Sequence, residues 1–211
     1  MQTFLEEAKR TSRTIANLST AVKNKVLKDM ADAIRQIASQ MEPVGRILDG
    51  WVTKDGLNIQ KVSIPIGVIG IIYESRPNVT SDTAALCFKS GNVCVLKGGK
   101  EAEHSNKAIA VVLKEVLAKN KLPEQAISLL PDSSREGVAK LIKQDKFVDL
   151  IVPRGGEELI KYVSKNSSIP VIKHDKGLCH IFVVKDAAPA KIIYIAINAK
   201  CQRPGVCNSM E

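Results

Sequence analysis

Apolar residues recur at helical spacing in the first part of the chain. Between residues 3 and 39, Ile15, Leu18, Val22 and Val26 lie three or four positions apart with charged residues between them. This is the pattern of an amphipathic helix, and we predict two helices there. From Val62 the pattern changes to a nearly continuous apolar run, VSIPIGVIGIIY, which contains a proline and a glycine. Such a run predicts a bent strand or a pair of strands.

Strands and helices are then predicted to alternate. The expected strands cover residues 93–97, 126–130, 148–152, 170–173 and 180–184. The expected helices cover residues 80–90, 102–118, 134–142, 157–165 and 188–199. This alternation indicates an α/β fold, in which right-handed crossovers build a mostly parallel sheet flanked by helices. Ligands of such sheets bind outside the carboxyl ends of the strands, so we expect the functional residues in the loops that follow the strands.

Composition excludes several classes of protein. The chain has 211 residues, of which 45% are hydrophobic and 25% charged, as in ordinary globular proteins. No apolar run reaches the roughly 18 residues of a membrane span, and the first residues lack the order of a secretory signal. The five cysteines are scattered and form no CxxC pair, which argues against a disulfide scaffold or a zinc site. We therefore expect a soluble cytoplasmic protein that does not associate with a membrane.

The net charge of +9 favours anionic partners. Only 4% of the residues are aromatic and no dense cluster of Lys and Arg occurs, which argues against nucleic acid. His104, His174 and His180 lack the spacing of metal ligands, so we expect no metal site. Small phosphorylated or carboxylated ligands remain as the candidate partners. The alternative is that the excess positive charge forms only a solvated basic face.

Two glycine loops follow predicted strands and form candidate anion sites. Glycine allows a backbone to approach a phosphate closely, and free N–H groups at the start of the next helix face it. Neither loop has the Walker or the GxGxxG pattern, and the alternative for each is a solvated turn. The residues concerned are Lys97, Gly98, Gly99 and Lys100 in the first loop and Arg154, Gly155 and Gly156 in the second.

A cysteine near the end of the sequence is a candidate nucleophile. Cys207 follows a proline and a glycine in a predicted loop, and Lys200 and Arg203 lie nearby in sequence. Cations favour the thiolate, which is the attacking species. Cys201 has similar charged neighbours, so local composition does not choose between the two thiols.

Four segments together resemble one family. They are IPIGVIGIIYESRPNVTSDTAALCFKSGN, LKGGKEAEHSN, VPRGGEELI and NAKCQRPGVCNSME, and in this order they resemble the γ-glutamyl phosphate reductases of the aldehyde dehydrogenase superfamily. The resemblance implies a Rossmann-like nucleotide-binding domain and an oxidoreductase of proline biosynthesis. This enzyme would reduce γ-glutamyl phosphate with NADPH, through a cysteinyl thioester, to glutamate 5-semialdehyde and phosphate. The resemblance also implies self-association into a homo-oligomer and a functional link to glutamate 5-kinase.

The resemblance assigns a role to several residues. Cys207 occupies the position of the nucleophile, and the loop of Arg154, Gly155 and Gly156 would lie near the pyrophosphate and nicotinamide. Lys100 stands where the superfamily usually has an acid that binds the adenosine ribose. A cation there suits a 2′-phosphate, and hence NADP(H) over NAD(H).

The substrate side is assigned in the same way. Arg76 and Arg203 would bind the phosphate or the α-carboxylate, for which a planar guanidinium is suited. Glu74 would meet the amino group of the substrate. The oxyanion-hole asparagine of the superfamily aligns near Ser75, so Asn78 is the candidate for the second donor. The general-base glutamate of the superfamily falls near Lys173 and His174, and its absence suits a reductase that must avoid hydrolysis.

We expect three regions. Residues 1–50 would form N-terminal helices, shortened relative to the family near residues 28–36, and residues 51–200 the NADP-binding domain. Residues 201–211 would begin a catalytic domain whose remainder is not in this sequence, because similar proteins continue beyond the nucleophile. An oxidising aldehyde dehydrogenase and a non-enzymatic nucleotide-binding fragment are the alternative functions.

Overall fold

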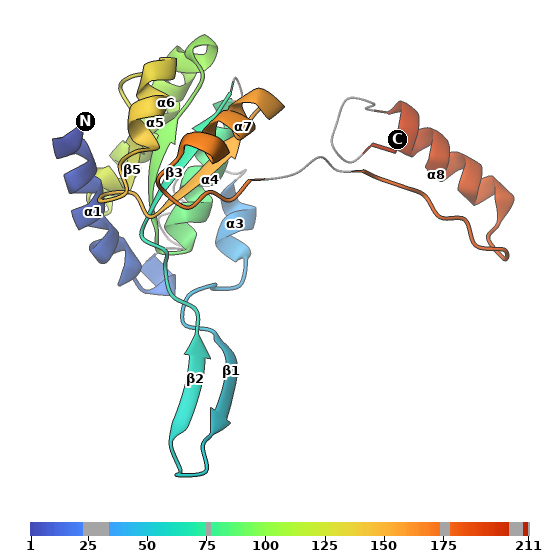
Figure 1. Cartoon of the computed structure of the whole chain (residues 1–211), viewed down its shortest axis with the longest axis horizontal. Coiled ribbons are helices and arrows are strands. Elements are labelled where there is room, and N and C mark those ends of the chain that lie inside the picture. The colour runs from blue at the N-terminus through green and yellow to red at the C-terminus, as the bar shows by residue number, and fades with distance from the viewer. Residues whose placement is uncertain (23–33, 75–76, 174–177, 203–208, 211) are drawn as a thin grey trace. The chain divides into compact units, whose positions relative to one another are not determined.

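The computed structural model describes residues 1–22, 34–74, 77–173, 178–202 and 209–210 (Figure 1). The chain divides into two compact units, Met1–Lys173 and His174–Glu211. The boundaries expected near residues 50 and 200 stay predictions. In the part of the chain that the structure describes, no helix combines the length and apolar character that crossing a membrane requires.

A four-stranded parallel sheet lies at the centre of the first unit. Its order is β5 (Ile127–Leu129), β4 (Val93–Lys97), β3 (Val68–Tyr73) and β6 (Leu150–Arg154). Each neighbouring pair is parallel. Every residue of β3 and β4 is buried, as expected for apolar strands that are covered on both faces. The predicted parallel sheet is therefore confirmed.

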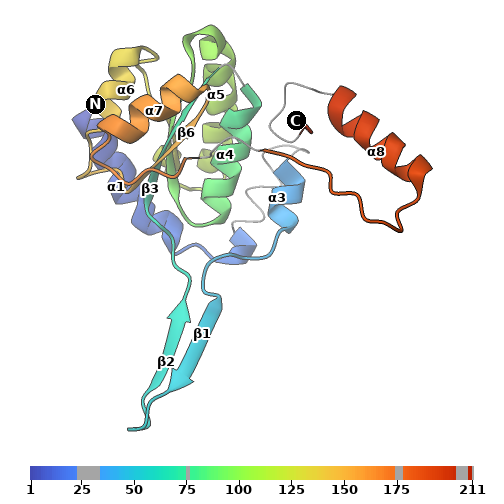
Figure 2. The ribbon, with the colours of Figure 1, turned by 45° about the vertical axis from the view of Figure 1, so that its right-hand side comes forward.

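Helices cover both faces of this sheet (Figure 2). α4 (Pro77–Lys89) and α5 (Glu103–Lys119) pack against each other on one face. α1 (Gln2–Ala16), α6 (Arg135–Leu141) and α7 (Glu157–Asn166) lie on the other face. This distribution follows from right-handed crossovers, because the chain moves from β3 to β5 in one direction and returns past β3 to reach β6.

Local signals set the ends of these helices. Gly91 has a φ of +71°, and the Asn92 N–H donates to the Cys87 carbonyl at 2.8 Å, which ends α4. At the start of α6, the Ser134 hydroxyl accepts the Gly137 N–H at 3.2 Å. The expected end of the first helix at residue 90 and the expected start of the other at residue 134 are confirmed to within one residue. α4 begins three residues earlier than the expected residue 80.

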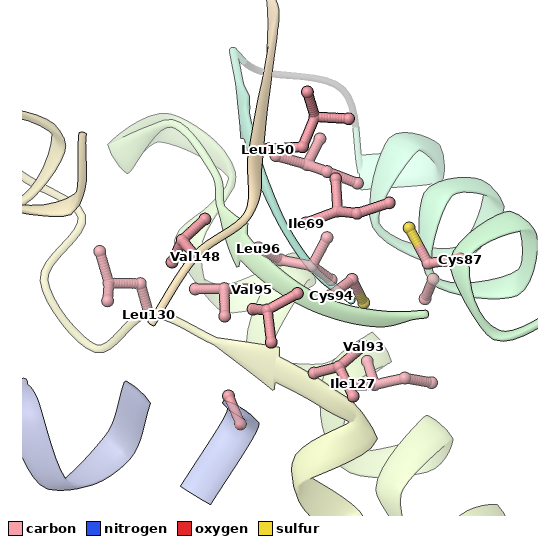
Figure 3. Close-up of a cluster of buried hydrophobic side chains, with 14 of the residues drawn as sticks. Ile69, Cys87, Val93, Cys94, Val95, Leu96, Ile127, Leu130, Val148 and Leu150 are labelled. Carbon is pink, nitrogen blue, oxygen red and sulfur yellow. The ribbon is translucent and has the colours of Figure 1, made fainter. Parts of the chain in front are cut away.

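The core lies between the sheet and its helices (Figure 3). Cys87 and Cys94 are both buried in it as free thiols. A hydrogen bond with Cys87, together with burial, raises the pKa of the Cys94 thiol. These two cysteines therefore act as small apolar residues.

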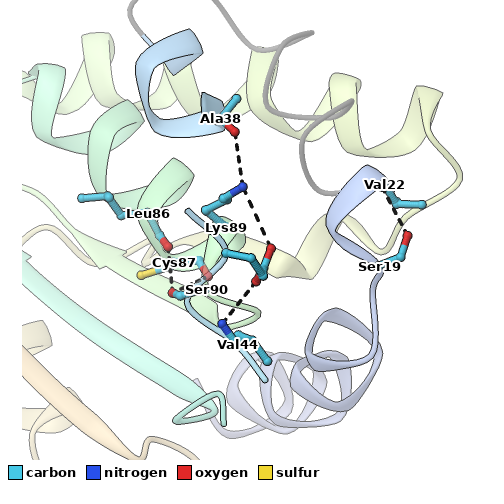
Figure 4. Close-up of polar contacts among 9 residues, drawn as sticks. Ser19, Val22, Ala38, Val44, Leu86, Cys87, Lys89 and Ser90 are labelled. Carbon is cyan, nitrogen blue, oxygen red and sulfur yellow. Dashed lines mark hydrogen bonds and ion pairs between the residues drawn. The ribbon is translucent and has the colours of Figure 1, made fainter. Parts of the chain in front are cut away.

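A buried cation links α4 to α3 (Arg35–Ser39) (Figure 4). The Lys89 side chain is 3% exposed, and its Nζ donates to the Ala38 carbonyl at 3.2 Å. Glu42 Oε2 lies 4.0 Å from the same nitrogen. Since a buried charge is costly without polar partners, these contacts explain how an ammonium group is accommodated there.

An antiparallel hairpin in the first unit was not predicted. It consists of β1 (Ile47–Val52) and β2 (Asn58–Val62), so the expectation of helices up to residue 50 is wrong for residues 47–50. Trp51 is 52% exposed, and no residue of either strand is buried. Because neither strand has a buried face, the sequence of the hairpin lacks the alternation of apolar and polar residues that predicts a strand packed on a core. The signal that was present is Asp55 with Gly56, a hairpin turn pair whose glycine has a φ of +86°.

Two predicted strands do not form. Residues 170–173 contribute only a single parallel bridge between Val171 and Ile151. In the second unit, residues 180–184 form no strand, and Phe182 is 89% exposed. A strand needs a continuous partner, and within the described residues the nearest pairing is one bridge between Cys179 and Met210. The helix expected at 188–199 is confirmed as α8 (Pro189–Cys201).

Candidate functional site

Four loops leave the carboxyl edge of the parallel sheet beside one another. The strand register places Lys97 opposite Ile72 and Arg154 opposite Tyr73. The two glycine loops therefore flank the end of β3, one after β4 and the other after β6. The loop of Asp132 follows β5 on the far side of β4. The expectation that these loops gather at one edge is confirmed.

The crevice between β3 and β6 is the topological switch point of the sheet, where α/β proteins bind their ligands. Glu74, directly after β3, meets the second glycine loop here. The Gly156 N–H donates to Glu74 Oε2 at 3.0 Å, and the Glu74 N–H donates to the Arg154 carbonyl at 3.2 Å. A carboxylate thus lies at the N-terminus of α7, where the helix dipole favours an anion.

The two lysines of the first glycine loop occupy different environments. Lys97 is 7% exposed, and burial lowers the pKa of its ammonium group, while Asp132 and Glu101 act in the opposite direction. Lys100 is exposed in the short 3-10 helix η2 (Lys100–Ala102). Lys97 therefore provides a partly desolvated charge at the base of the loop, and Lys100 a solvated charge at its rim.

Gly98 is required by close packing. A Cβ at this position would lie 2.2 Å from Asn106 Nδ2 and 3.2 Å from the Tyr73 ring. In the second loop, a Cβ at Gly155 would lie 2.7 Å from Glu74 Cδ. The sequence predicts glycine here for close approach to a phosphate. At Gly98 the structure adds a second reason, because the Asn106 amide is buried, whereas the Glu74 side chain beside Gly155 is exposed and can move aside.

A cavity of about 490 Å³ lies beside this crevice, within the usual size of small-molecule sites. It is lined by Glu74, Arg135, Val138, Glu158, Leu159 and Tyr162. Sequence reasoning missed Arg135 and Tyr162. Arg135 did carry a signal, because it is a cation in the first turn of α6, where the helix dipole disfavours positive charge. Tyr162 carried none, since an aromatic residue on an amphipathic helix is ordinarily a packing residue.

The loop of Asp132 is ordered by local hydrogen bonds. Asp132 Oδ1 accepts the Ser134 N–H at 2.9 Å, and hydrogen bonds from Ser134 lower the pKa of the Asp132 carboxyl. The Ser133 hydroxyl donates to Glu103 Oε2 at 2.9 Å, and Lys107 donates to the other Glu103 oxygen at 2.6 Å. These bonds join the loop to the first turns of α5.

The structure brings together the predicted cofactor residues of both glycine loops, with Glu74 between them. Asn78 lies in the first turn of α4, and its amide donates to Asp82 Oδ2 at 3.2 Å. Cys201 is exposed at the end of α8. The remaining predicted residues lie outside the described part of the chain, namely Arg76, Arg203 and Cys207.

Comparisons with known proteins agree with this fold. The aldehyde dehydrogenase family model matches residues 1–210. The chain is 66% identical to a γ-glutamyl phosphate reductase of Aliarcobacter butzleri and 59% identical to one of Sulfurovum sp.. Each alignment spans 256 positions, gaps included, and covers 100% of this chain and 62% of the relative.

A crystal structure of γ-glutamyl phosphate reductase from Thermotoga maritima superposes with a TM-score of 0.92 at 33% identity. That match covers 100% of this chain and 62% of the other. The chain thus spans about 62% of the length of the relatives that it matches. The match along residues 1–210 and the high identity to named members show that this chain belongs to the aldehyde dehydrogenase family.

Proposed function

We propose that the protein reduces γ-glutamyl phosphate to glutamate 5-semialdehyde, with NADPH as the cofactor and Cys207 as the nucleophile. The observation that carries the proposal is the gathering of two glycine loops and a 490 Å³ cavity at the carboxyl edge of a parallel sheet. The identity to proteins named γ-glutamyl phosphate reductase supports the choice of substrate. Membership of the aldehyde dehydrogenase family implies a nicotinamide cofactor.

The described residues fit a phosphorylated dinucleotide. Lys97, Lys100 and Arg135 would hold its phosphates, and the cavity between α6 and α7 is large enough for part of a nucleotide. Lys100 and Arg135 are both exposed, so either cation can reach a 2′-phosphate in solvent. NADPH, when bound, supplies a hydride.

The proposed covalent chemistry runs through one thiol. The Cys207 thiolate forms a C–S bond with the acyl carbon of γ-glutamyl phosphate, and the C–O bond to the phosphate breaks, so that inorganic phosphate leaves. The resulting thioester carbon then accepts a hydride. The tetrahedral oxyanion collapses, the C–S bond breaks, and Cys207 returns to the thiolate as the aldehyde leaves. Backbone N–H groups, with Asn78 as a candidate side-chain donor, would stabilise the oxyanion.

Three charged side chains have proposed substrate roles. Arg76 and Arg203 would bind the phosphate or the α-carboxylate as planar bidentate donors. Glu74 would bind the amino group of the substrate. Because its carboxylate accepts the Gly156 N–H, this contact requires either the second carboxylate oxygen or release of Gly156.

Replacement of the nucleophile tests the proposal. Cys207→Ser should lower the rate of γ-glutamyl phosphate reduction by about a thousandfold or more, because a hydroxyl is far less nucleophilic than a thiolate. Cys201→Ser is the matched control and should retain the full rate. Full turnover by Cys207→Ser would disprove the nucleophile. Aldehyde oxidation that proceeds without phosphate would indicate an oxidising aldehyde dehydrogenase, since the reductase run in reverse consumes phosphate.

A further inference from the structure

Three buried polar side chains from three elements form one hydrogen-bonded chain at the carboxyl edge. Tyr73 ends β3, Thr80 lies in α4 and Asn106 lies in α5, and they are 2%, 0% and 1% exposed. Tyr73 Oη and Thr80 Oγ1 are 2.7 Å apart, and the Thr80 hydroxyl donates to Asn106 Oδ1 at 2.9 Å. Since the threonine has one hydroxyl proton and donates it to Asn106, the Tyr73 hydroxyl must donate to Thr80. The direction of the whole chain is therefore determined.

This direction also determines where the amide nitrogen of Asn106 faces. With Oδ1 turned toward Thr80, Nδ2 faces Gly98 of the first glycine loop, where a Cβ would lie only 2.2 Å away. The space beside them is a cavity of about 10 Å³, lined in part by Gly98, Gly99, Asn106 and Ser133. That volume accommodates about one water molecule and no part of a nucleotide. Asn106 therefore contacts the side of the loop that faces the protein interior.

We infer that Asn106 is a positioning residue for nucleotide binding, because it supports the backbone of Gly98 and thereby sets where Lys97 and Gly99 face the ligand. The inference rests on the proposed function, because it assumes that this loop binds the nucleotide. Tyr73 and Thr80 act through Asn106 by fixing its orientation. None of the three side chains needs to contact the nucleotide for its affinity to depend on them.

Substitutions in the chain of hydrogen bonds test this role by NADPH titration of the folded protein, followed by fluorescence. Asn106→Ala should raise the Kd for NADPH about fivefold to twentyfold, because the variant loses the side chain that packs against Gly98 and the buried hydrogen bond that holds this side chain to Thr80. Thr80→Val should act in the same direction, because valine keeps the shape and removes the hydroxyl. Thr80→Ser keeps the hydroxyl and should bind NADPH as the unmodified protein does.

A double-mutant cycle tests the contact with Gly98 directly. Gly98→Ala alone should weaken NADPH binding, since its Cβ collides with Asn106 Nδ2. In the double variant Gly98→Ala with Asn106→Ala, the added methyl group occupies the space that the amide has left. We expect the combined increase in Kd to be smaller than the product of the two single increases. A combined increase equal to that product would contradict the contact.

Asn92→Ala is the control for loss of a buried asparagine. Asn92 is 3% exposed, accepts the Gly67 N–H at 2.9 Å and lies at the amino edge of the sheet, away from the loops. The Asn92→Ala variant should lower the melting temperature, as Asn106→Ala does, but it should change the Kd for NADPH less than about twofold.

The possible outcomes separate the two proposals. Absence of NADPH binding by the unmodified protein would overturn the proposed function, and the inference with it. If the unmodified protein binds NADPH and folded Asn106→Ala and Thr80→Val bind it equally well, the inference alone is wrong. If Asn106→Ala does not fold, the comparison of Thr80→Val with Thr80→Ser decides the question by itself.

Discussion

The backbone N–H of Gly156 donates to the carboxylate of Glu74 at 3.0 Å, across 82 positions of sequence. This bond joins the end of β3 to the start of α7 at the switch point of the sheet. The N–H group concerned is one of those that a pyrophosphate would use at this helix terminus. A carboxylate of the protein therefore lies where the proposed function requires an anionic ligand, and binding of that ligand must displace it or tolerate its charge.

Glu74→Gln removes this charge and keeps an oxygen acceptor for Gly156. We expect NADPH to bind about twofold to fivefold more tightly at low ionic strength, because repulsion between the carboxylate and the phosphates is lost, and the gain should shrink at high salt. The free energy of unfolding should fall by about 0.3–1 kcal/mol, since an anion at a helix N-terminus is stabilising. Titration with NADPH at two ionic strengths measures the first effect and urea denaturation the second. Glu124→Gln, an exposed acid at the opposite edge of the sheet, is the control, and an equal gain there would contradict a local effect.

Lys97 should make NADPH binding sensitive to alkaline pH. Burial lowers the pKa of its ammonium group below the usual 10.5, so the charge is lost earlier than on an exposed lysine. The affinity for NADPH should fall as the pH rises through this lowered pKa. Titrations across the alkaline range should show a flat, weaker profile for Lys97→Met, whereas Lys100→Met, which removes an exposed lysine, should keep the decline. An unchanged decline in Lys97→Met would assign the pH dependence to another group.

The same pKa shift has a consequence for stability. Below the lowered pKa both the folded and the unfolded states carry the proton on Lys97, and between that pKa and 10.5 the unfolded state binds it more tightly. The contribution of Lys97 to the free energy of unfolding therefore rises with pH across that window. Lys97→Met should remove this contribution, and the difference between the two denaturation profiles measures it.

Lys100→Glu tests the choice between the two nicotinamide cofactors. Reversal of the charge should raise the Kd for NADPH about tenfold or more and change that for NADH much less, because only NADPH carries a 2′-phosphate. Lys119→Glu makes the same charge change at the last residue of α5, far from the loop, and should affect both nucleotides slightly and equally. Equal large losses for NADPH and NADH in Lys100→Glu would argue against the 2′-phosphate contact. If Arg135→Ala shows the selective loss of NADPH affinity and Lys100→Glu does not, then Arg135, which lines the cavity, binds the 2′-phosphate.

Asp149→Ala should destabilise the fold without affecting the site. Asp149 Oδ2 accepts the Val68 N–H at 2.8 Å, and its other oxygen pairs with Lys9, so one carboxylate holds the first residue of β3 and a residue of α1. Its loss should lower the free energy of unfolding by about 1–3 kcal/mol, measured by chemical denaturation. The NADPH affinity should not change, because these contacts lie at the amino edge. Asp145→Ala, at an exposed neighbouring position, is the control and should be nearly neutral.

The accuracy of the sequence predictions depended on burial. The strand expected at 93–97 coincides with β4, because all its residues are buried and all but Lys97 are apolar. The β1 and β2 hairpin was missed, since exposed strands leave no core-facing pattern. The strand expected at 180–184 was wrong, because an apolar run becomes a strand only where another segment pairs with it. For the site, the glycine loops were predicted from local residues, whereas Arg135 became a candidate only when α6 and α7 enclosed a cavity.

The amino-acid sequence by itself determined the alternation of strands and helices and the placing of two glycine loops after strands. These properties are local, because apolar periodicity and turn residues act over a few positions. The tertiary structure decided which residues meet and how they are solvated. It ordered the strands so that both loops flank β3, joined Glu74 to Gly156, and buried Lys97 while leaving Lys100 in solvent. Desolvation and hydrogen bonding between distant segments arise only when the helices pack on the sheet, so no local pattern contains them.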